Sequence, residues 1–109
     1  MVKTLEKELK RGTLEMLLLK LIGEKPTYGY EIVTMLEQRA AQLQLRESTL
    51  YPVLYRLEND GFITAEWETH ERGVPRKYYS LTTAGAKELD HLVHEWQDFT
   101  TTINRFLEL

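Results

Sequence analysis

Two stretches in the first part of the chain carry apolar residues at helical spacing. Residues 3–23 place leucines three and four positions apart, and the segment LEMLLLKLI within them is apolar almost all round. This pattern predicts a long helix whose second half is buried. Gly23 and the nearby Pro26 mark its end. A second helix is expected from about Tyr28 to Ala41, with Thr27 as its cap.

A third helix is expected in the segment STLYPVLYRLENDG, residues 48–61. Ser48 or Thr49 would cap it, and Pro52 would then fall in the first turn, where a missing N–H costs little. Gly61 suits the left-handed conformation that ends many helices. The inward stripe consists of Leu50, Val53, Leu54 and Leu57. The outward face carries Thr49, Tyr51, Pro52, Tyr55, Arg56 and Asn59.

Beyond residue 61 the apolar residues alternate with the period of a β-strand. The segment FITAEWE puts Ile63, Ala65 and Trp67 on one side. The segment RKYYSL opposes Lys77, Tyr79 and Leu81 to Arg76, Tyr78 and Ser80. Because the polar stretch THERGVP lies between them, the pattern predicts a β-hairpin with a long tip.

After a capping Thr82 or Thr83, residues 84–109 carry an apolar seam with heptad spacing. The seam consists of Leu89, Leu92, Trp96, Phe99, Ile103 and Phe106. A helix over these residues would be about 39 Å long and would extend beyond a domain of this size. The stripe therefore calls for another chain. We also expect Leu5 and Leu9 to pack against the last helix of a partner, so that both chain ends build a dimer.

Three helices followed by a hairpin is the order of a winged helix, a mainly α fold with a small β-hairpin. We expect a winged helix-turn-helix domain at residues 1–83 and a C-terminal dimerisation helix at residues 84–109. In such a fold the third helix enters the DNA major groove. Its outward hydroxyls and Arg56 suit phosphates and base edges. Arg72, Arg76 and Lys77 flank the hairpin tip and can neutralise phosphate.

Composition modifies this interpretation only a little. The net charge of −3 argues weakly against nucleic acid, but residues 1–83 are neutral overall and the excess of acidic residues lies after them. The chain has no cysteine, which excludes disulfides and thiol catalysis. No apolar run of about 18 residues suggests a membrane span. The charged start lacks the apolar block of a signal peptide, so we expect a cytoplasmic protein.

The segments TYGYEI, STLYPVLYRLENDGFI and RKYYSLTTAG, with the Trp-bearing last helix, resemble the PadR family of transcriptional regulators. The resemblance spans about residues 9–107 and fits the short subfamily with a single C-terminal dimerisation helix. It implies a homodimeric, effector-responsive repressor on a palindromic DNA operator. By position it implies DNA contacts for Tyr51, Arg56, Arg76 and Lys77, and places Tyr28 and Gly29 near the phosphate backbone.

Arg56 is preferred to Arg46 as a DNA contact because we expect it on the same side of its helix as Tyr51. The full predicted DNA-binding set is Tyr28, Thr49, Tyr51, Tyr55, Arg56, Arg72, Arg76 and Lys77.

Multidrug-sensing short members of the family hold planar aromatics between paired tryptophans at the dimer centre. Trp96 stands at the matching place, with Leu92, Val93 and Phe99 around it, which implies a small planar aromatic effector. The flanking HEWQDF differs from those members, so the ligand itself is not implied. Plain packing in the dimer core explains Trp96 equally well. The nearby Glu95 and Asp98 would favour a cationic ligand, or simply form a solvated face.

Two alternatives remain. The overall acidity allows a winged-helix module that binds proteins and does not read DNA. His91 and His94 lie three positions apart near Glu88 and could bind zinc, although two histidines without a third ligand are more often plain surface. The chain lacks a glycine-rich phosphate loop and the HExxH and Gly-x-Ser-x-Gly motifs. We therefore expect no enzyme activity, no cofactor and no metal.

Overall fold

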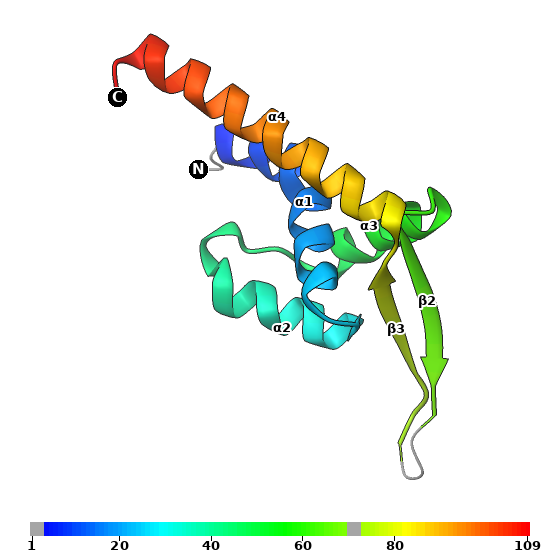
Figure 1. Cartoon of the computed structure of the whole chain (residues 1–109). Helices are drawn as coiled ribbons and strands as arrows, with labels where there is room; N and C mark the ends of the chain where they lie inside the picture. Colours follow the sequence, from blue (N-terminus) through cyan, green and yellow to red (C-terminus); the bar gives the residue numbers. More distant parts are fainter. Residues whose placement is uncertain (1–3, 70–72) are drawn as a thin grey trace.

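The computed structural model describes residues 4–69 and 73–109 of the chain, which are drawn in colour in Figure 1. The elements in chain order are α1 (Thr4–Glu24), β1 (Thr27–Tyr28), α2 (Gly29–Arg39), the 3-10 turn η1 (Ala41–Leu43), α3 (Glu47–Asn59), β2 (Ile63–Glu68), β3 (Arg76–Leu81) and α4 (Thr83–Leu107). Three helices followed by a hairpin and a long last helix confirm the predicted winged-helix order. Arg72 lies outside the described residues.

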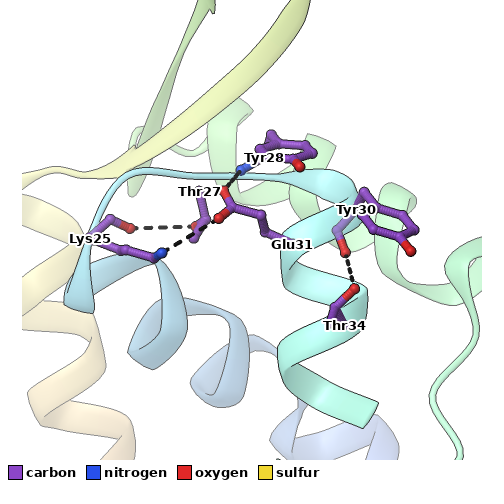
Figure 2. A network of polar contacts seen from close by, with 6 residues as sticks. All are labelled: Lys25, Thr27, Tyr28, Tyr30, Glu31 and Thr34. Carbon is purple, nitrogen blue, oxygen red and sulfur yellow. Dashed lines mark hydrogen bonds and ion pairs between the residues drawn. The ribbon is translucent and has the colours of Figure 1, made fainter. Parts of the chain in front are cut away.

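The sheet has one strand more than the predicted hairpin. β1 pairs antiparallel with β3, with Thr27 opposite Tyr79 and Tyr28 opposite Tyr78, and the strand order is β1-β3-β2. Thr27 is fully buried in this strand and therefore does not cap α2, as we had expected. Tyr28 is the N-cap residue instead, and its backbone N–H donates to the Glu31 carboxylate at 3.3 Å (Figure 2).

The core lies between the second half of α1, the inward stripes of α2 and α3, and one face of the sheet. Its buried members are Leu14, Leu18, Leu19, Leu21, Ile22, Ile32, Leu36, Leu50, Leu54, Leu57, Ile63 and Tyr79. The predicted burial of LEMLLLKLI and of the α3 stripe is confirmed, with Val53 only partly buried. Each fully buried leucine or isoleucine contributes about 1.5–3 kcal/mol through removal of apolar surface from water.

Helix α3 begins earlier than its sequence suggests. Arg46 is the N-cap residue, and the Arg46 carbonyl accepts hydrogen bonds from the N–H groups of Thr49 and Leu50 at 3.0 and 3.1 Å. Pro52 therefore lies in the second turn, and the prediction that it falls in the first turn is wrong. A proline there removes the N–H that would bond to the Ser48 carbonyl. Ser48 is exposed, so water can solvate that carbonyl.

The root of α4 is held tightly against the hairpin. Thr82 caps the helix, as predicted: its hydroxyl accepts from the Gly85 N–H at 2.9 Å and donates to the Gly61 carbonyl at 2.7 Å. A Cβ added at Gly85 would lie 2.0 Å from the Phe62 carbonyl oxygen, so only glycine lets the helix approach this closely. From this root α4 runs across α1 and past it, as Figure 1 shows. No helix in residues 4–69 or 73–109 is long and apolar enough to cross a membrane.

Candidate nucleic-acid interface

A hollow of about 450 Å³ lies where the hairpin meets the start of α2 and the outer side of α3. It is lined by Tyr28, Gly29, Tyr30, Tyr51, Trp67, Arg76, Lys77 and Tyr79. We call it the wing hollow. Tyrosine hydroxyls and two cations around a shallow concavity match the groups that bind DNA phosphates.

The β1–β3 pairing sets the position of Arg76. It places the rings of Tyr28 and Tyr78 side by side, with centroids 5.3 Å apart. The Arg76 guanidinium carbon lies 4.6 Å from the centre of the Tyr28 ring, a cation–π contact that orients the side chain. Glu68 lies opposite Arg76 in the β2–β3 pairing, but no ion pair of Arg76 is formed within the described ranges.

Tyr51 reaches the hollow from α3 because α2 begins with a glycine. A Cβ added at Gly29 would lie 2.5 Å from the Tyr51 hydroxyl oxygen. The ring therefore packs directly on the first turn of α2, and 45% of the Tyr51 surface is exposed. Figure 2 shows Tyr28 and Tyr30 at the same end of the helix, where the first backbone N–H groups and the helix dipole favour a negative charge.

Lys77 also lines the hollow, but its charge is already paired. Its Nζ lies 3.1 Å from a carboxylate oxygen of Glu58 on α3. This hydrogen bond raises the pKa of Lys77, against a smaller opposing effect of burial. The Lys77–Glu58 ion pair thus links strand β3 of the hairpin to α3. The neighbouring Tyr79 is buried in the sheet, and this burial raises the pKa of its hydroxyl.

Arg56 and Thr49 lie on the other side of α3. Arg56 is five positions from Tyr51, which is about 140° around a helix. Its Nε donates to a carboxylate oxygen of Glu15 on α1 at 3.0 Å, and its Nη2 bonds to the same oxygen. The expectation that Arg56 shares the side of Tyr51 is therefore wrong. Thr49 lies with Arg56 in a separate cleft toward α1.

The structure brings Tyr28, Tyr51, Arg76 and Lys77 together out of the predicted DNA-binding set. Tyr55 lies one helical turn beyond Tyr51 and is 72% exposed. Tyr30 and Trp67, which is 68% exposed at the hollow, were not among the residues predicted to bind DNA. The sequence signal for Tyr30 is the second tyrosine of TYGYEI, which lies in the first turn of α2 close to Tyr28.

The predicted dimer residues divide into two groups. Leu89 and Leu92 pack partly against the core of their own chain. Farther along α4 the stripe is uncovered: the exposed fractions are 37% for Trp96, 55% for Phe99, 41% for Ile103 and 86% for Phe106. Leu5 and Leu9 of α1 are likewise 72% and 38% exposed.

A second hollow of about 440 Å³, the α1–α4 hollow, lies beside this stripe. Its described lining includes the predicted effector residues Leu92, Trp96 and Phe99, together with Glu95 and Asp98, whereas Val93 is not part of it. The histidines of α4 have local partners. His91 Nε2 lies 3.0 Å from a Glu95 oxygen, and His94 Nδ1 lies 2.8 Å from the Asp90 carbonyl. Among the residues that the structure describes, no three ligand side chains converge on a metal position.

Comparison with known proteins gives consistent matches. Residues 18–91 match the model of the "Transcriptional regulator PadR-like family". An uncharacterized protein of Lysinibacillus sphaericus is 40% identical over 90% of this chain and 91% of its own length. A crystal structure of a PadR family transcriptional regulator from Eggerthella lenta superposes with a TM-score of 0.82, at 36% identity, over 93% of this chain and 87% of its own.

The Bacillus subtilis negative transcriptional regulator PadR is 30% identical over 72% of this chain, which spans 42% of that protein. The crystal structure of Bacillus subtilis PadR in complex with operator DNA matches with a TM-score of 0.66 at 29% identity, over 78% of this chain and 46% of its own. The winged-helix fold, the family match and these relatives agree: the chain belongs to the PadR-like family of transcriptional regulators.

Proposed function

We propose that the protein is a homodimeric repressor that binds a palindromic DNA operator and releases it when a small effector binds. The membership in a family of transcriptional regulators supports this proposal, as does the relative bound to operator DNA. The observation that carries the proposal in this chain is the wing hollow, where an Arg76 oriented by Tyr28 stands beside tyrosine hydroxyls and a helix N-terminus.

In this proposal α3 enters the major groove, and the residues of the wing hollow contact the adjoining phosphate backbone. Tyr55 lies on the outermost part of α3 and faces the base edges. Tyr28, Tyr51 and Arg76 bind one phosphate group, and Lys77 contributes its remaining donors beside them. Arg56 and Thr49 contact the backbone on the flank of α3, and Arg56 does so only when it leaves Glu15.

The uncovered stripe of α4 supports the dimer. The chain exposes 8210 Å² of surface. A compact monomer of its 12.9 kDa mass would expose only about 6,300 Å², so roughly 1,900 Å² is in excess. Two chains together have about 3,800 Å² of such excess, within the roughly 2,000–5,000 Å² that obligate homodimer interfaces bury in total. Pairing α4 with its copy, with Leu5 and Leu9 at the edges, would cover part of it and present two α3 helices about 34 Å apart, one turn of DNA.

The effector in this proposal is a planar aromatic molecule in the α1–α4 hollow. Trp96 and Phe99 offer ring faces there, and Glu95 and Asp98 favour a positive charge on the ligand. A ligand that fits only one angle between the two α4 helices shifts the population of dimers toward that angle. If the favoured angle moves the α3 helices away from the DNA repeat, the operator is released.

The test is a salt titration of binding to duplexes selected from a random pool, with Arg76→Gln compared with wild type. The substitution removes one phosphate contact from each protomer, hence two from the proposed dimer, and should lower the slope of log affinity against log salt by about 2, with equal weakening on all duplexes. Arg105→Gln, which removes a cation near the end of α4, is the matched control and should change neither quantity. Absence of any duplex binding at low salt would refute the proposal and favour a protein-binding module.

A further inference from the structure

A cleft of about 390 Å³ lies between the first turns of α1 and the start of α3, away from the wing hollow. We call it the α1–α3 cleft. Five cations and one carboxylate line it: Lys7, Lys10, Arg11, Arg46, Arg56 and Glu15. Its apolar wall is formed by Leu14, Leu45 and Val53. In a chain whose net charge is −3, this is a marked local excess of positive charge.

The cleft originates in the pattern of α1. The stripe that faces the core contains Leu18 and Leu14, and at the same three- and four-residue steps it continues to Arg11 and Lys7. Two further leucines at these positions would close the space against α3. The chain instead places cations where the core stripe ends, so both sides of the cleft carry apolar and cationic side chains next to one another.

Three of the five cations have a carboxylate partner, but only one of these pairs is close. Glu15 is engaged with Arg56. The pairs Lys10–Glu6 and Arg11–Glu8 have N–O distances of 3.7 and 3.8 Å on the surface of one helix, a kind of pair that contributes little. Lys7 and Arg46 have no carboxylate partner in the described part of the chain. Lys7 and Arg46 are therefore the cations of the cleft that an added anion could pair with.

We propose that the α1–α3 cleft binds a small amphiphilic organic anion. Its compact apolar body would lie against Leu14, Leu45 and Val53, and its carboxylate, sulfonate or phosphate group would face Lys7 and Arg46. The α1–α4 hollow has the opposite charge, with Glu95 and Asp98 in its lining, and disfavours the same ligand. The two hollows lie on opposite sides of α1, so they select ligands of opposite charge.

The proposed dimer leaves this cleft open. Leu9 lies two positions from Lys7 and from Arg11, roughly 160° around the helix, so it faces away from the cleft. The ligand would also touch α3 directly, because Thr49, Val53 and Arg56 line the cleft. An acid group competes with Glu15 for Arg56. This consequence for DNA binding rests on the proposed function, whereas the binding of the anion does not.

The test compares two fluorescent probes with the same aromatic body, titrated into the full chain without DNA. The probes are 8-anilinonaphthalene-1-sulfonate and the neutral N-phenyl-1-naphthylamine. The sulfonate should bind at least about tenfold more tightly to the wild type. Replacing both Lys7 and Arg46 by glutamine should weaken the sulfonate about tenfold and the neutral probe less than about twofold. Both side chains are exposed, and circular dichroism verifies that the variant is folded.

Lys20→Gln, on an exposed position of the same helix but outside the cleft, should bind both probes as the wild type does. Sulfonate binding that survives the double substitution would overturn the proposal. A second outcome would also overturn it: wild type does not bind the sulfonate, and the double variant binds every duplex more weakly than wild type. The cleft would then be a DNA-binding surface. Sulfonate binding by a chain that binds no duplex would uphold this proposal and refute the proposed function.

Discussion

Replacement of Phe99 by alanine should dissociate the proposed dimer without unfolding the protomer. Phe99 is 55% exposed in the single chain. A phenylalanine buries about 200 Å² when fully covered, so about 110 Å² of this residue is available to a partner. Alanine would lose roughly two thirds of that area, which is about 2 kcal/mol per protomer at 25 cal/mol per Å². A two-fold interface counts the loss twice, so the dimer should weaken by about 4 kcal/mol, or nearly a thousandfold in Kd.

Sedimentation equilibrium over a wide concentration series measures this change directly. The matched control is Gln97→Ala, because Gln97 is exposed two positions away and lies on the opposite side of α4. It should keep the wild-type dissociation constant, and both variants should keep the wild-type helical circular dichroism. If Phe99→Ala dimerises as tightly as wild type, or if wild type is a folded single copy throughout the series, α4 does not join two chains in the manner we propose.

Three further predictions concern the packing of Gly85, the Glu15–Arg56 pair, and the titration of Lys77 and Tyr79. Gly85→Ala should lower the free energy of unfolding by about 1–3 kcal/mol, because its Cβ would meet the Phe62 carbonyl at 2.0 Å; Gly12→Ala, whose Cβ meets nothing within 4 Å, should be neutral or stabilising in the same thermal melts. Glu15→Gln should release Arg56 and raise affinity for all duplexes equally, and an unchanged salt slope would mean that Arg56 never contacts phosphate. Stability should fall in alkali for two reasons. Because the folded state raises the pKa of Lys77, its pairing with Glu58 contributes fully below pH 10.5 and is lost as pH rises through the folded-state pKa. Because the folded state also raises the pKa of Tyr79, its hydroxyl ionises more readily in the unfolded chain above pH 10.0, which favours unfolding. Urea melts of Tyr79→Phe should show a shallower alkaline decline, and a decline as steep as that of wild type would contradict this assignment.

The helices and the hairpin could be predicted from sequence because each carries apolar residues with a clear period, whether its own chain buries them or not. The starts of α2 and α3 could not. A threonine before a helix is a common cap, but Thr27 is withdrawn into the sheet by its pairing with Tyr79. The strand β1 has only two residues, too few to show alternation. Arg46 caps α3 with its backbone alone, for which no side-chain signal exists.

The candidate site could be predicted only in part for a similar reason. That Tyr28, Arg76 and Lys77 share one hollow follows from the fold, and the family resemblance pointed to them. The position of Arg56 was within reach of helical geometry, because five residues correspond to about 140° around the axis. Its partner Glu15 is 41 positions away, and no local pattern indicates that pair. The excess of cations in the α1–α3 cleft likewise appears only when α1 and α3 are brought together.

Strand β1 joins the hairpin to α2, and the Lys77–Glu58 pair joins it to α3. In the proposed mechanism the hairpin, α2 and α3 form one unit, and α4 turns relative to it about Gly85 and Thr82. Because displacement grows with distance from the axis of rotation, a turn of a few degrees at Gly85 and Thr82 would move the far end of α4 several times farther than the side chains near these residues. Substitutions at Gly85 or Thr82 should therefore change the proposed effector response without altering any side chain of the proposed DNA interface.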